Sequence, residues 1–285
     1  MDAIILKSFL PEIFLSLAIL VQLVYNSRFI NILNFNSPII DREVFGQTFF
    51  ILLCVFFLFL NLKIESFLPN FLFLNDESSR VIKLLFVFSC LISSFVISRS
   101  FSLQKLNFFE FFSILLLSIL SLLLLTSSCD LLSTYLLIEM QALCFYILAS
   151  FRRSSAFSTE AGLKYFISGS FISGLFLFGA SLIYGCLGTL NFNHLSLLLS
   201  FSLNEELIVF KYFVLLGILL ITIVLLFKIA SAPFHFWAPD VYEGAPLSST
   251  IIFSILPKLV IFSFFMKWVS VICCFFTEIK DIFVF

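Results

Sequence analysis

Charged residues are scarce in this sequence. Lys and Arg total 16 and Asp and Glu total 17, which is 12% of 285 residues and leaves a net charge of −1. A soluble domain usually carries about 25% charged residues, and a nucleic-acid binder needs a basic face. The shortage of charge therefore excludes a water-soluble enzyme, a nucleic-acid binder and a disordered scaffold.

Residues that bind metals, nucleotides or other cofactors are also few. There are two histidines, His194 and His235, and the seven cysteines include no C-x-x-C pair. Most of the cysteines lie in apolar runs, where they act as small hydrophobic residues rather than as metal ligands. A Gly-rich phosphate loop is absent as well, so we expect no nucleotide chemistry, no metal and no cofactor on this chain.

Apolar residues, by contrast, make up 61% of the positions, Phe alone accounts for 43, and the mean hydropathy is +1.18. At about 20 residues per crossing, this composition is sufficient for roughly eight transmembrane helices. We therefore predict an all-α polytopic membrane protein. Apolar runs separated by polar breaks place its spans at 9–25, 44–60, 81–98, 108–125, 131–150, 161–187, 207–230 and 248–276.

Two local patterns predict how these spans are arranged. The fourth and fifth spans are separated only by Thr126 to Asp130, so they form an antiparallel hairpin. The stretch Leu190 to Glu206 is amphipathic, and we expect it to lie at the membrane interface. Glycines recur every five or six residues in the sixth span, which predicts close helix packing. They are Gly169, Gly174, Gly179 and Gly185.

Ionisable residues at membrane depth are costly, and they are therefore candidates for function. Glu139 lies nine residues past Asp130, so at 1.5 Å per residue its Cα is roughly 13 Å into the fifth span. Lys258 lies ten residues into the last span, directly after Pro257, which removes a backbone donor beside the amine. We interpret both as groups that change protonation state in use. The alternative for Glu139 is a structural acid that is hydrogen-bonded to a neighbouring helix.

Lys228 follows sixteen apolar residues, so at the end of a simple helix its amine could extend to the membrane surface. The apolar character nevertheless continues, and the 31 residues from Leu207 to Trp237 are too many for one straight crossing. Pro233 favours a break in this helix, which would leave Lys228 at depth beside free backbone carbonyls. Broken helices of this kind mark ion pathways in transporters.

Two further residues each allow two interpretations. Lys164 lies four residues after Glu160, so it either forms an ion pair at a helix start or belongs to an ion path. His235 either lines the broken segment or donates a hydrogen bond to a carbonyl.

A resemblance to a known family is carried by IEMQALCFYILASFRRSSAFSTEAGLKYF, by FKIASAPFHFWAPDVYEGAP and by the LPK that follows. These stretches resemble the antiporter-like membrane-arm subunits of respiratory complex I, and HFWAPDVYEGAP is typical of subunit 2 of NADH:ubiquinone oxidoreductase. The resemblance extends from about Leu131 to Lys258, and nearer the N-terminus only the spans and the LPEI at 10–13 match. One difference is Leu247-Ser248, where the family usually has Thr-Pro.

This resemblance implies a fold and its division along the chain. Residues 1–107 would form three leading transmembrane helices, and 108–276 would form one five-helix antiporter-like repeat with a Pro-broken seventh helix. Residues 277–285 would be a short C-terminal tail. The family fold has a second, inverted repeat without a counterpart in these residues, so we expect a separate polypeptide to supply that missing half.

The resemblance also implies a role for each candidate residue. Glu139 would tune Lys228, Lys228 would accept and pass a proton, and Lys258 would relay it laterally. Lys164 would support this path, and His235 is a further candidate for it.

The expected function is therefore proton translocation within an H⁺-translocating NADH:ubiquinone reductase. NADH, flavin, iron–sulfur clusters and quinone would bind to other subunits, and the partners would be other membrane-arm subunits and membrane lipids. The expected location is the mitochondrial inner membrane, since the Phe, Leu, Ile and Asn usage fits an AT-rich organellar gene. A monovalent cation/proton antiporter and a structural subunit with a decayed proton path stay open as alternatives.

Overall fold

The computed structural model describes residues 7–30, 38–62, 72–104, 110–200 and 208–279, and within these ranges the chain is almost entirely helical. Eight helices there are long and apolar enough to cross a membrane, as predicted. They are α2 (Leu10–Ile30), α3 (Pro38–Asn61), α4 (Glu77–Gln104), α5 (Glu110–Ser127), α6 (Leu131–Ala149), α7 (Ala156–Leu187), α9 (Ile208–Ile229) and α11 (Leu247–Ile279). Two short helices, α8 (Phe192–Ser200) and α10 (Trp237–Gly244), lie between them.

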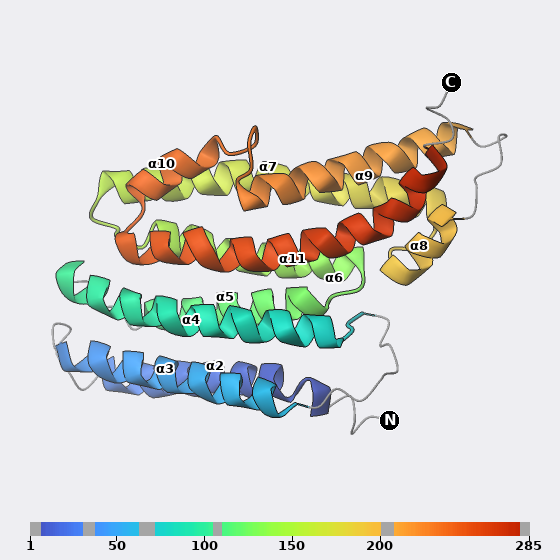
Figure 1. The fold of residues 1–285 in the computed structure, drawn as a ribbon. Coiled ribbons are helices and arrows are strands. Elements are labelled where there is room, and N and C mark those ends of the chain that lie inside the picture. Colours follow the sequence, from blue (N-terminus) through green and yellow to red (C-terminus); the bar gives the residue numbers. More distant parts are fainter. Residues whose placement is uncertain (1–6, 31–37, 63–71, 105–109, 201–207, 280–285) are drawn as a thin grey trace.

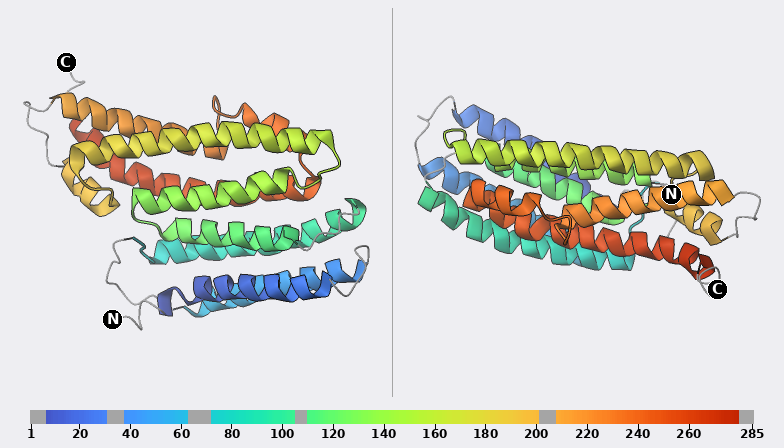
Figure 2. Two further views of the ribbon diagram at one scale, coloured as in Figure 1. Left: turned by 180° about the vertical axis from the view of Figure 1, so that it is seen from behind. Right: turned by 90° about the horizontal axis from the view of Figure 1, so that it is seen from above.

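The long helices run side by side in one bundle (Figure 1). The leading helices α2 and α3 lie at one side of the bundle, and α7, α9 and α10 lie at the other, in both the front and the rear view (Figure 2). Between them, α5 packs against α2 and α6, and α11 packs against α4, α5, α6 and α9. The amphipathic stretch 190–206 contains the short helix α8, which packs on α11, while 201–207 lie outside the described residues. Its location at the membrane interface stays a prediction.

The lipid bilayer explains why helices dominate. Its core offers no water to hydrogen-bond with backbone N–H and C=O groups, and a helix pairs these groups within its own segment. The frequent serines follow the same rule. Ser118 and Ser121, both buried on α5, donate their Oγ to the carbonyls of Leu115 and Ser118, three residues earlier. A buried hydroxyl therefore costs little here.

The glycines of α7 fulfil their predicted packing role at two of four positions. A Cβ on Gly179 would lie 3.0 Å from the carbonyl oxygen of Gly217 on α9, and a Cβ on Gly169 would overlap the hydroxyl of Tyr146 on α6. The expectation is not met for Gly174 and Gly185 within the part of the chain that the structure describes, because none of its atoms lies within 4 Å of a Cβ at either position. Regular spacing placed four glycines on the helix, but only two of them face a neighbouring helix.

The predicted break in the seventh span is confirmed. Helix α9 ends at Ile229, Ala230 adopts a positive φ of 61°, and residues 230–236 are non-helical before α10 begins. Residues after the break donate to two carbonyls of the last turn of α9, those of Leu226 and Phe227. The backbone N–H and the Oγ of Ser231 both donate to the carbonyl of Leu226 at 3.1 Å. By contrast, α11 continues as a helix through Pro257.

Candidate functional site

The amine-bearing residue at the break, Lys228, lies in the last turn of α9 and is only 7% exposed. It therefore does not extend to the surface, which is the outcome expected for a broken helix. None of the described carboxylates lies within ion-pairing distance of it. The carboxylate of Glu139 on α6 acts on the amine of Lys228 electrostatically without contact.

Glu139 is half-buried on α6, and its Oε1 is buried without a hydrogen-bond partner. The structure thus brings Glu139 and Lys228 into electrostatic range without joining them in a contact pair.

Lys258 lies half-buried on α11, and its Nζ is 5.6 Å from the centroid of the Tyr242 ring on α10. An ammonium within about 6 Å of an aromatic face is attracted by the ring quadrupole. The sequence had singled out Lys258 by its depth, but the aromatic partner, sixteen residues earlier across a turn, was not predicted.

Lys164 forms the predicted i, i+4 ion pair with Glu160, at 3.0 Å, and a second ion pair with Asp240 on α10, at 2.9 Å. Its side chain is 49% exposed. Lys164 is therefore separate from the buried lysines, and its ion pairs connect α7 to α10. The side chain of His235 is exposed within the 230–236 segment.

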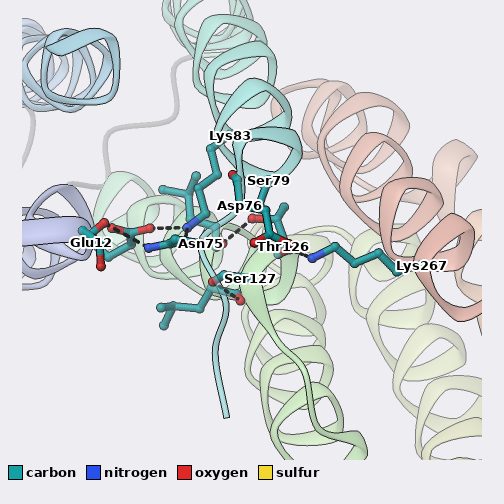
Figure 3. A network of polar contacts seen from close by, with 11 residues as sticks. Glu12, Asn75, Asp76, Ser79, Lys83, Thr126, Ser127 and Lys267 are labelled. Carbon is teal, nitrogen blue, oxygen red and sulfur yellow. Dashed lines mark hydrogen bonds and ion pairs between the residues drawn. The ribbon is translucent and has the colours of Figure 1, made fainter. Parts of the chain in front are cut away.

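A second ionic cluster joins the leading helices, and sequence reasoning missed it. Lys83 on α4 donates to Glu12 Oε1 on α2 at 2.5 Å and to Asn75 Oδ1 at 2.6 Å (Figure 3). Lys83 is 1% exposed and Glu12 is 3% exposed. Asn75 in turn donates from Nδ2 to the backbone carbonyl of Ser8 at 3.0 Å. The ion pair is therefore held from three segments of the chain.

Further contacts extend this cluster to the helices of the expected repeat. The amine of Lys267 on α11 donates to the carbonyl of Thr126 at the end of α5 (Figure 3). Beside it, the backbone N–H of Leu74 donates to the carbonyl of Ser127 at 2.7 Å. One end of α5 is thus bound both to the segment before α4 and to α11.

The signal that could have identified this cluster is weak. Lys83 lies six residues after the start of α4, next to the polar run NDESSR, so it looked like a border lysine. Glu12 lies in the first turn of α2, where an acidic residue is ordinary. Each residue is unremarkable alone, and their significance comes from a contact across 71 positions of sequence.

No group of three or more His, Cys, Asp or Glu side chains within the described ranges could hold a metal ion. The expectation that cofactors bind elsewhere stays a prediction.

Comparisons with known proteins agree with this geometry. The family model described as NADH:quinone oxidoreductase/Mrp antiporter, TM, matches residues 128–285. The NADH-ubiquinone oxidoreductase chain 2 of Marchantia polymorpha is 38% identical over 255 residues, which cover 87% of this chain and 51% of that protein. The NADH-quinone oxidoreductase subunit N of Pelagibacter ubique is 35% identical over 93% of this chain and 54% of its own length. The chain thus spans about half the length of these relatives.

Solved structures show the same fold. A chain of respiratory complex I from Thermus thermophilus, solved with bound aureothin, aligns with a TM-score of 0.70 and 27% identity, over 90% of this chain and 52% of that chain. A chain of the Mrp complex from Dietzia aligns with a TM-score of 0.67 at 18% identity, over 91% and 48%. The second likeness concerns the fold alone.

Proposed function

Because this chain belongs to the NADH:quinone oxidoreductase/Mrp antiporter family, we propose that it is a proton-translocating membrane-arm subunit of respiratory complex I. The observation that carries the proposal is the buried Lys228 at the broken end of α9, within electrostatic range of Glu139 and without an ion pair to any of the described carboxylates. Redox energy would come from NADH oxidation on other subunits, and this chain would have no redox site.

The proposed mechanism is electrostatic gating. When the carboxylate of Glu139 approaches Lys228, the protonated amine is favoured, and when they separate, the proton is released. Two unit charges about 4 Å apart in an effective dielectric of about 20 interact by about 4 kcal/mol. That energy changes a proton-binding equilibrium by about a thousandfold, which is sufficient to load and unload one amine in a cycle.

From Lys228 the proton would pass laterally to Lys258, with Lys164 and His235 as supporting residues. Since the relatives are about twice as long as this chain, we propose that helices equivalent to their remaining half pack beside α6, α9 and α11. The expectation that a separate polypeptide supplies them is tested by mass spectrometry of the purified complex. A complex in which helices of no other subunit approach Lys258 would contradict lateral relay.

We also propose the mitochondrial inner membrane as the location. The Phe, Leu, Ile and Asn usage, which fits an AT-rich organellar gene, supports this location. The relatives include bacterial subunits as well, so similarity alone does not assign it. Co-fractionation with inner-membrane markers and with NADH-oxidising activity tests this assignment.

Replacement of the two charged partners tests the mechanism. Lys228→Ala and Glu139→Ala should each abolish most NADH-driven proton uptake by membrane vesicles, because each leaves the other partner without its counter-charge. Lys228→Arg should not restore pumping fully, since a guanidinium stays protonated. Lys211→Ala, near the start of the same helix, is the matched control and should pump normally. Normal pumping by Lys228→Ala would overturn the proposal.

The same vesicles separate the alternatives. A monovalent cation/proton antiporter would show sodium- or potassium-dependent proton movement without NADH, and the family model's description includes such antiporters. A structural subunit would tolerate both alanine variants as long as the complex assembles.

A further inference from the structure

The short helix α10 connects the broken end of α9 to the start of α11. Its first residue, Trp237, is buried and donates from its indole Nε1 to the carbonyl of Phe227 at 3.0 Å. Phe227 directly precedes Lys228, so the indole is attached to the backbone beside that lysine. A face of Trp237 also stacks on Tyr165 of α7, with centroids 4.9 Å apart and planes 8° from parallel.

Tyr242, five residues further along α10, continues this contact towards the second lysine. Its ring packs edge-on against Trp237, with centroids 6.0 Å apart and an angle of 75°. The ring of Tyr242 also lies under the amine of Lys258, with 5.6 Å between the ring centroid and Nζ. The hydroxyl of Tyr242 is buried without a hydrogen-bond partner, so the contact that the structure shows for this side chain is made by the ring.

We propose that Trp237 and Tyr242 form an aromatic bridge between the end of α9, beside Lys228, and the amine of Lys258. In this bridge, Tyr242 is the positioning residue for Lys258. This inference rests on the proposed function and extends it to the connection between the two lysines. A displacement of the broken helix end would move Trp237 through its hydrogen bond and Tyr242 through the ring contact. The amine of Lys258 would therefore respond to the state of Lys228.

Aromatic rings suit this role for two physical reasons. Each ring has only two side-chain torsions, so a contact between two rings has few degrees of freedom that could absorb a displacement. The ring face also attracts the ammonium form of lysine without forming a permanent ion pair, so the amine can be held in place and still lose its proton.

Replacement of Tyr242 separates the ring from the hydroxyl. Tyr242→Phe keeps both ring contacts and removes the unpartnered hydroxyl, and it should pump at the wild-type ratio of protons to electrons. Tyr242→Leu keeps apolar volume and removes the ring face. A cation–π contact of the usual strength corresponds to about a two- to fivefold change in an equilibrium, and we expect the proton-to-electron ratio of this variant to fall by at most that factor.

A matched control is available on α7. Tyr184 is 56% exposed, and it is about 35 Å along α7 from the first turns of that helix, at 1.5 Å per residue. Helix α10 packs on those first turns, where Gly244 lies directly against Ala161 and the backbone of Phe157. Tyr184→Leu removes the same ring without touching the bridge, and it should pump normally.

The experiment uses the assembled complex in native membrane vesicles, with assembly followed on native gels and pumping normalised to NADH oxidation. Equal losses in Tyr242→Phe and Tyr242→Leu would overturn the inference, because the hydroxyl would then carry the effect. Normal pumping by Tyr242→Leu would overturn it as well. If Lys228→Ala abolishes pumping while Tyr242→Leu has no effect, only the bridge is refuted, whereas normal pumping by Lys228→Ala refutes the proposed function itself.

Discussion

Replacing Lys83 by methionine tests whether the buried ion pair with Glu12 holds the leading helices to the rest of the bundle. Methionine fills a similar volume but carries no charge and donates no hydrogen bond. In Lys83→Met, the Glu12 carboxylate would lose its counter-charge at a site where its Oε2 already has no partner, and Asn75 would lose a donor to its side-chain oxygen.

The expected loss of stability in Lys83→Met follows from the burial of the ion pair. Both side chains are almost fully removed from solvent, at 1% and 3% exposure. Removing one partner of such a pair costs about 3–5 kcal/mol, because a charge is left uncompensated. For a chain of this size, such a loss lowers the melting temperature by on the order of 10 °C. The double variant, with methionine at both positions, removes the uncompensated charge and should recover most of the stability.

The assay is thermal denaturation of the detergent-solubilised complex, with retention of this chain followed by size-exclusion chromatography after heating. Lys7→Met, at an exposed position just before α2, is the control and should melt like the wild type. The reasoning would be refuted if Lys83→Met melted at the wild-type temperature, or if the double variant were less stable than either single variant.

Two further variants probe contacts elsewhere in the bundle. Gly169→Ala should reduce the amount of assembled complex on native gels, because its Cβ would overlap the hydroxyl of Tyr146, whereas Gly174→Ala should assemble normally, since no atom of the described residues lies within 4 Å of a Cβ there. Equal yields would show that the side chain of Tyr146 moves aside at no cost. Lys164→Met should lower pumping, because we propose that Lys164 supports the proton path. It should not lower assembly, because exposed ion pairs with Glu160 and Asp240 add little stability. Loss of assembly in that variant would instead assign the residue a structural role.

The number and type of elements could be predicted from the sequence because the bilayer imposes local rules. Each span must be about 20 apolar residues long and must satisfy its own backbone, so eight spans were predicted and eight are present among the described residues. The break after Ile229 was predictable for the same reason, since it depends on the length of one segment and on a nearby proline. The burial of Lys228 follows from that break.

Contacts between helices depended on the tertiary structure, because they require the rotation and depth of each helix against its neighbours. Lys83 meets Glu12 only because α4 and α2 present those residues to each other, 71 positions apart. The rotation of α7 likewise places Gly169 against Tyr146, whereas Gly174 has no neighbour within 4 Å among the described residues, although both follow the same spacing in sequence. The ring of Tyr242 reaches Lys258 because the chain reverses between α10 and α11. Hydropathy is a local property, so the sequence alone singled out Glu139, Lys228 and Lys258. The burial of the Lys83–Glu12 pair is set by the packing of helices, and so are the partners of the other charges.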